Sequence, residues 1–264
     1  MSNNNTFSSR RFSLLFKQHF IHNNKLLLYS TVAYVGVVFL LLSLVQVAEN
    51  FYPHDLENFR GFLIGFVLVC GILYTGYAFP AFRSKESSIN YIMVPGSVLE
   101  KFLFELVSRI GLILILLPFL YWVTFNMQGY FFTLFMKYTF EPVGIQYLTK
   151  VEIPDEVDGL FWFVTLVASG VMLGFILPFT GAAMFSKQPL IKTLFAVAII
   201  ITLYSAYAYV VVEHLGLANY NPNDSLWLIP NNVADAYQFF GIALILANLI
   251  MIILAYRKLK EREV

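Results

Sequence analysis

The sequence has little charge, almost no cysteine and a net charge close to zero. Asp, Glu, Lys and Arg make up only 12% of its 264 residues, against roughly 25% in soluble domains. With 59% hydrophobic residues, the chain lacks the polar side chains needed to cover a soluble fold of this size. The single cysteine, Cys70, excludes an internal disulfide and a cysteine-based metal site. The net charge of +1 gives no reason to expect a nucleic-acid partner.

The common motifs of enzyme active sites are also missing. The sequence contains no G-x-x-x-x-G-K-[ST] phosphate loop, no H-E-x-x-H zinc motif and no G-x-S-x-G nucleophile elbow. Its four histidines are scattered outside the apolar segments. We therefore expect no catalytic, cofactor-binding or metal-binding residue in this chain, and no enzymatic activity of its own.

Long apolar segments dominate the sequence instead. A helix needs about 20 mostly apolar residues to cross a bilayer, and the period-2 alternation of a membrane β-barrel is absent. The predicted spans are residues 26–48, 61–82, 102–125, 160–185, 193–212 and 236–255. The sequence thus predicts an all-α integral membrane protein, with six transmembrane helices in a single transmembrane domain over residues 1–264.

The basic residues predict the orientation of these spans. Thirteen of the 17 Lys and Arg residues lie before the first span, after the last, or in the second and fourth loops. Because cytoplasmic loops hold the excess of Lys and Arg, we expect both termini to be cytoplasmic and residues 126–159 and 213–235 to be extracytoplasmic. The apolar stretch 226–230 fits either a hairpin that re-enters the membrane or a loop folded on the helix ends.

The segment before the first span has a helical pattern of its own. Phe12, Leu15, Phe16 and Phe20 follow the i, i+3, i+4, i+8 spacing, with basic residues elsewhere on the wheel. This pattern predicts an amphipathic interfacial helix over residues 10–22. The alternative is an apolar N-terminal tail without a defined role.

The loop over residues 83–101 is the most organised polar segment. A helix from Ser87 to Val94 places Ile89, Ile92 and Met93 on one face, and Pro95 with the following glycine ends it.

A second helix begins directly after this stop. Ser97 and Glu100 have the spacing of a capping box, in which each side chain accepts from a backbone N–H of the other residue. The helix is predicted to run from Val98 to Phe125 with Pro118 as the one residue that could interrupt it, and Glu105 and Arg109 are spaced to pair across one turn. That pair is either a weak interfacial ion pair or part of a route that carries force from a cytoplasmic partner. The candidate force-transmitting residues are Glu100, Lys101, Glu105 and Arg109.

The order of these features resembles the permease subunits of type-2 ABC transporters, also called type V exporters. In that family the loop after the second span carries roughly Glu-x-Gly-Thr, a Leu pair and Pro-x-Ser. Here Lys85-Glu86-Ser-Ser-Ile-Asn-Tyr-Ile-Met-Val-Pro95-Gly-Ser97 follows that outline and continues to Glu100-Lys101-Phe102, similar to a Bacteroidetes-like branch. The chain departs from the family in having Ser87-Ser88 in place of Gly-Thr, and a longer outer segment over 126–159.

The resemblance implies a function and a set of partners. Residues 87–94 would be a coupling helix that docks on a separate nucleotide-binding ATPase subunit, which would bind ATP and Mg, and residues 10–22 would be the connecting helix. The chain would form a homo- or heterodimer with a second permease chain in the lipid bilayer of the bacterial cytoplasmic (inner) membrane, and would export a hydrophobic or amphipathic substrate. The candidate docking residues are Arg83, Lys85, Glu86, Ile89, Tyr91, Ile92 and Met93.

A second interpretation comes from a different functional class. The long outer segment over residues 126–159 would also suit a non-transporting membrane scaffold or sensor whose extracytoplasmic segments bind an envelope partner.

Overall fold

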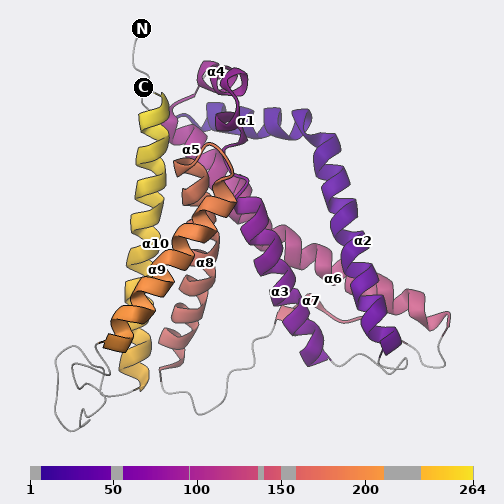
Figure 1. Cartoon of the computed structure of the whole chain (residues 1–264). Helices are drawn as coiled ribbons and strands as arrows, with labels where there is room; N and C mark the ends of the chain where they lie inside the picture. The colour runs from indigo at the N-terminus through magenta and orange to yellow at the C-terminus, as the bar shows by residue number, and fades with distance from the viewer. Residues whose placement is uncertain are drawn as a thin grey trace. The chain divides into compact units, whose positions relative to one another are not determined.

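A computed structural model describes residues 7–48, 56–94, 96–135, 140–149, 159–210 and 233–263, and these contain helices and no β-strand. This confirms the prediction of an all-α chain. In order the helices are α1 (Ser9–His22), α2 (Asn24–Ala48), α3 (Leu56–Thr75), the 3-10 helix η1 (Pro80–Arg83), α4 (Lys85–Met93), α5 (Val98–Leu106), the π-helix η2 (Val107–Gly111), α6 (Leu112–Thr133), α7 (Ile145–Thr149), α8 (Leu160–Met184), α9 (Pro189–Tyr209) and α10 (Val233–Glu263) (Figure 1).

Five helices in the described part are long and apolar enough to cross a membrane. They are Asn24–Ala48, Val98–Thr133, Leu160–Met184, Pro189–Tyr207 and Val233–Arg262, and a shorter apolar helix covers Phe59–Thr75. These lengths and compositions are those of a multi-pass membrane protein.

Several helix ends differ from the predicted spans. The second apolar helix ends at Thr75, before the predicted end at residue 82, because Phe79 adopts a left-handed backbone (φ 51°) and Pro80 cannot continue an α-helix. The third apolar helix begins with α5 at Val98 and continues through η2 and α6 to Thr133, past the predicted end at residue 125. Pro118 lies inside it. Residues 126–133 are therefore helical, and the prediction that the outer segment begins at residue 126 is wrong about its structure.

The described chain divides into two compact units, of which unit 1 comprises residues 1–71 and 95–152. Figure 1 shows α1 turning sharply into α2 at Asn23, whose backbone N–H donates to His19 O at 3.0 Å. The core of unit 1 is formed by α2, α3, α6 and α7. Its buried residues are Val38, Leu42, Phe59, Leu63, Tyr121, Phe125 and Leu148.

Part of the predicted outer segment folds back onto this core. The Trp122 indole N–H donates to the Val143 carbonyl at 2.6 Å, while the Asn126 side chain accepts from the Val143 N–H at 2.9 Å and donates to its carbonyl at 3.1 Å. Both backbone groups of Val143 are thus satisfied by side chains of α6, in place of the hydrogen bonds that a helix or sheet would supply. Residues 140–149 therefore form an ordered return along α6.

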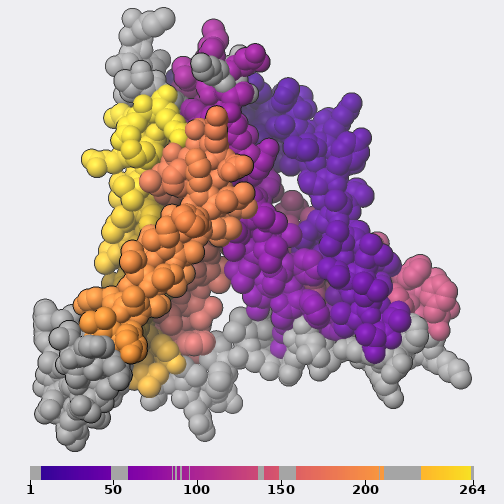
Figure 2. All heavy atoms as spheres, in the orientation of Figure 1, coloured from indigo at the N-terminus to yellow at the C-terminus, as the bar shows by residue number. Residues whose placement is uncertain are grey.

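Unit 2 comprises residues 72–94 and 153–264 and is built on the packing of α8 against α9 and α10. Asn248 on α10 donates to the Ser169 carbonyl at 2.9 Å, and Thr180 donates to the Met251 carbonyl at 3.2 Å. Figure 2 shows α9, in orange, along the face of the unit turned to the viewer. Its apolar side chains remain exposed, for example Phe195 at 68%, as suits a helix that faces lipid rather than water.

Candidate functional site

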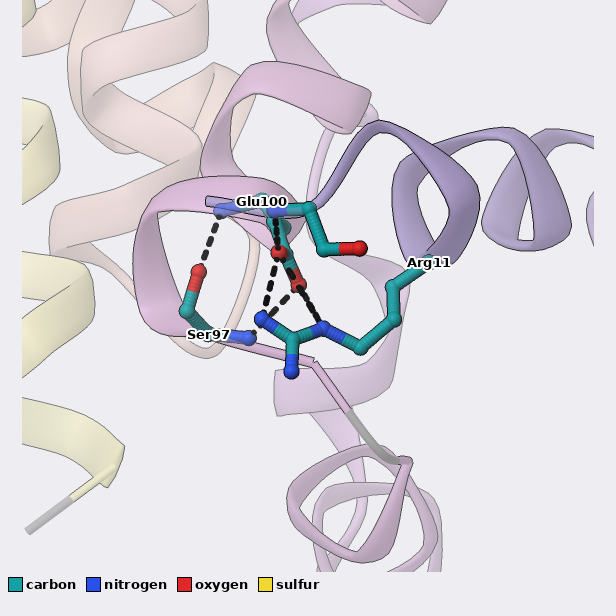
Figure 3. Close-up of polar contacts among 4 residues, drawn as sticks. Arg11, Ser97 and Glu100 are labelled. Atoms are coloured by element: carbon teal, nitrogen blue, oxygen red, sulfur yellow. Dashed lines mark hydrogen bonds and ion pairs between the residues drawn. The ribbon is translucent and has the colours of Figure 1, made fainter. Parts of the chain in front are cut away.

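The first candidate site joins α1 to the start of α5 and lies within unit 1. We call it the α1–α5 junction and define it by Ser8, Arg11, Ser97 and Glu100 (Figure 3). Glu100 is fully buried. Its Oε1 accepts from the Ser8 backbone N–H at 2.6 Å and from Arg11 Nη2 at 2.9 Å, and Arg11 Nε lies 3.2 Å from both carboxylate oxygens. The carboxylate therefore ties the N-terminal helix to the third apolar helix.

The same carboxylate completes the predicted capping box. Glu100 Oε2 accepts from the Ser97 backbone N–H at 2.9 Å, and Ser97 Oγ accepts from the Glu100 backbone N–H at 3.2 Å. One side chain thus performs two tasks, since it caps α5 and holds Arg11 of α1. Capping contacts alone contribute about 1 kcal/mol, and the charge-assisted contacts to Arg11 add to this.

Aromatic packing continues the contact along α1. The Phe16 ring lies 4.9 Å from the Phe104 ring, and the His19 imidazole lies 5.2 Å from the same ring, both nearly edge-on. The amphipathic face predicted for residues 10–22 therefore packs on α5 through Phe16. Edge-to-face pairs of this kind add about 0.5–1.5 kcal/mol beyond their buried area.

All four candidate force-transmitting residues gather in this region and are buried. Their exposed fractions are 0% for Glu100, 3% for Lys101, 4% for Glu105 and 6% for Arg109. Arg109 Nε donates to Glu105 Oε2 at 3.2 Å, as the spacing predicts. Both charged groups are thus removed from water and held by a close partner, as buried ions require.

The Glu105–Arg109 pair spans an irregular turn of the helix. Residues Val107–Gly111 form a π-helix between α5 and α6. Such insertions are uncommon and often mark functional positions. The sequence contained no signal for the π-turn, because Pro118, the residue with a known tendency to disturb a helix, lies about two turns further along in regular α6.

His19 makes the packing of α1 on α5 dependent on pH, because its imidazole lies against the Phe104 ring. The pKa of His19 is lowered from its ordinary value of 6.5, mainly by burial and next by the Arg109 guanidinium. Glu105 raises this pKa, and His22 lowers it further, but neither effect is as large as those two. The unfolded chain thus binds a proton more readily than the folded one. The stabilisation from neutral His19 is complete above pH 6.5 and is lost as the pH falls toward the lowered pKa.

We expect the melting midpoint of the purified chain in detergent to be lower at about pH 5.5 than at about pH 7.5. Replacing His19→Phe should reduce this difference, because Phe keeps a ring against Phe104 and cannot titrate. His22→Phe, made at an exposed position of the same helix, is the matched control and should leave most of the difference in place, because His22 is the last of the causes that act on the His19 pKa. An unchanged pH difference in His19→Phe would contradict the assignment.

The second candidate site is α4, which lies in unit 2. Ser88 Oγ donates to the Ala81 carbonyl at 3.0 Å and to the Ser84 carbonyl at 2.8 Å, and the Tyr91 ring packs against the Phe82 ring at 5.2 Å. Helix α4 is therefore held on η1 by one face. The opposite face, which we call the α4 face, consists of Glu86, Ile89, Ile92 and Met93, all exposed, with Met93 at 76%.

The remaining candidate docking residues are placed differently. Arg83 is half-buried, and its guanidinium lies 3.5 Å from the centre of the Tyr77 ring. Tyr91 belongs to the face that packs on η1. Lys85 begins α4, and its side chain lies outside the described residues. The sequence therefore indicated the apolar face of α4, but not that the Arg83 and Tyr91 side chains pack against Tyr77 and Phe82.

Sequence reasoning also missed Ser8 and Arg11 as partners of Glu100. A buried acid in a capping box indicates that a further donor must approach it. Arg11 lies 89 positions before Glu100, and no local spacing identifies so distant a partner.

In the described part of the chain no three His, Cys, Asp or Glu side chains come together as metal ligands would. No family model, curated protein or solved structure matches this chain.

Proposed function

We propose that this chain is the permease subunit of an ABC exporter with six transmembrane helices and cytoplasmic termini, powered by ATP that a separate nucleotide-binding subunit hydrolyses. The observation that carries the proposal is the α4 face. A short helix directly after the second apolar helix exposes two isoleucines and a methionine beside a glutamate, and such a patch is suited to a protein partner.

Two further features support this assignment. The sequence contains no phosphate loop, so ATP would have to be hydrolysed by another chain. The α1–α5 junction would fix the predicted connecting helix on the third apolar helix, because Glu100 holds α1 against the first turn of α5. In the bacterial inner membrane, the excess of basic residues would place α1, α4 and the junction on the cytoplasmic side.

The α4 face predicts the effect of a single substitution on partner binding. Ile89→Arg puts a charge into an apolar interface, and we expect it to lower the amount of co-purified ATPase by about tenfold or more. The measurement is ATP hydrolysis by the complex purified from native membranes, with mass spectrometry to identify a partner that carries a phosphate loop.

The matched control is Ile191→Arg. Ile191 is 63% exposed against 58% for Ile89 and lies in the first turn of α9, outside the α4 face. It should retain the ATPase. A chain that purifies without an ATPase, or whose partners are unchanged by Ile89→Arg, would instead favour the scaffold or sensor, for which the ordered return at residues 140–149 supplies an outer surface.

A further inference from the structure

Two half-buried arginines in unit 2 have hydrogen-bond donors that no described residue accepts. Nε and Nη2 of Arg83 and Nη1 of Arg262 are buried without an acceptor among the residues the structure describes. A buried donor left unsatisfied costs about 1–3 kcal/mol, and more when it is charged. Three such donors on two cations indicate an acceptor that does not belong to the described chain.

Both guanidinium groups are held in place around η1. Arg83 stacks on Tyr77 at 3.5 Å, and Arg262 lies 5.3 Å from the centre of the Phe82 ring, the residue next to Arg83. Arg262 also donates through Nη2 to the Met184 carbonyl at the end of α8, at 2.8 Å. These contacts orient the two side chains without using the three free donors.

No carboxylate in the described residues neutralises this pair. Glu261, the acidic neighbour of Arg262 on α10, bonds to Lys258 at 2.7 Å instead, and Glu86 lies on the exposed α4 face. Lys192 adds further positive charge near the end of α8, 5.8 Å from the Phe185 ring. The region therefore attracts an anion, and nothing in its own described chain supplies one.

From this arrangement we infer that Arg83 and Arg262 bind a phosphate group. Arginine matches phosphate because its planar fork offers several donors to several oxygens. The end of α10 is suited to a lipid headgroup, since Lys258, Lys260 and Arg262 fall within five residues and follow the exposed apolar Ile253 and Leu254 by one to two turns. Basic clusters at the ends of membrane helices recognise anionic headgroups. The phosphate comes from an anionic phospholipid or from soluble phosphate.

The test uses the full chain purified in detergent, with bound phosphatidylglycerol counted by native mass spectrometry and phosphatidylcholine as the neutral comparison. Arg83→Gln and Arg262→Gln should each weaken phosphatidylglycerol binding by about tenfold. Arg257→Gln is the matched control, because it removes the same charge from an exposed position on the same helix, and should change binding less than twofold. Arg83→Lys keeps the charge but loses the fork, so it should lose binding as well.

A parallel titration with inorganic phosphate, followed by thermal shift, separates the two sources. Lipid binding that depends on both arginines identifies a headgroup site, while the same dependence for inorganic phosphate alone identifies a soluble phosphate; either result supports the inference. Equal losses in Arg257→Gln, equal binding of phosphatidylcholine, or no arginine-dependent binding of either probe would overturn it. Loss of the ATPase in Arg83→Gln with phosphate binding unchanged would also overturn it.

Discussion

Glu100→Ala should destabilise the chain by about 3 kcal/mol, which is the lower end of the cost of breaking a buried ion pair by removing one partner. The fully buried carboxylate accepts from two backbone N–H groups and from Arg11, whose side chain is 27% exposed. Its removal leaves the Ser8 and Ser97 N–H groups without acceptors and the Arg11 guanidinium without its counter-ion. Partial exposure of Arg11 lets water compensate in part, so the expected cost stays near that lower end.

The measurement is the free energy of unfolding of the purified chain in detergent. Glu261→Ala is the matched control, because Glu261 also pairs with a basic residue, Lys258 at 2.7 Å, but at an exposed position of α10. Exposed pairs contribute about 0–1 kcal/mol, so the control should lose little. If both variants lost the same amount, the α1–α5 junction would not hold the helices together.

Gly181→Ala should destabilise unit 2 by about 1–3 kcal/mol, the usual cost of overpacking a close contact. A Cβ built on Gly181 overlaps the Thr193 hydroxyl oxygen and lies 2.7 Å from the Thr193 Cβ. Because Thr193 is β-branched and its hydroxyl already donates to the Pro189 carbonyl at 2.7 Å, it cannot rotate away freely. Helices α8 and α9 would have to separate to make room.

The control for this substitution lies two turns earlier on the same helix. A Cβ on Gly174 meets nothing within 4 Å, so Gly174→Ala should be neutral or slightly stabilising through helix propensity. Thr193→Ala in the Gly181→Ala background should recover part of the loss, since it removes the hydroxyl and one methyl but leaves the Cβ in place. Equal melting midpoints for Gly181→Ala and Gly174→Ala would show that the two helices do not approach here.

Local signals in the sequence were sufficient for some parts of the candidate sites. Ser97 and Glu100 form the predicted capping box, and Glu105 and Arg109 pair across one turn, because both arrangements depend on spacings of three and four residues. The apolar face of α4 was visible for the same reason. Local spacing does not show which side of a helix another segment will cover, so the inward positions of Arg83 and Tyr91 were not predicted.

The sequence by itself determined that the chain is helical and built from long apolar segments, because composition and helical periodicity act over a few turns. Only the tertiary structure decided that Glu100 binds Arg11 and Ser8, that residues 140–149 return along α6, and that Arg262 approaches Phe82 of η1. These contacts join residues far apart in the chain, and they depend on how whole helices pack, which no short stretch of sequence encodes.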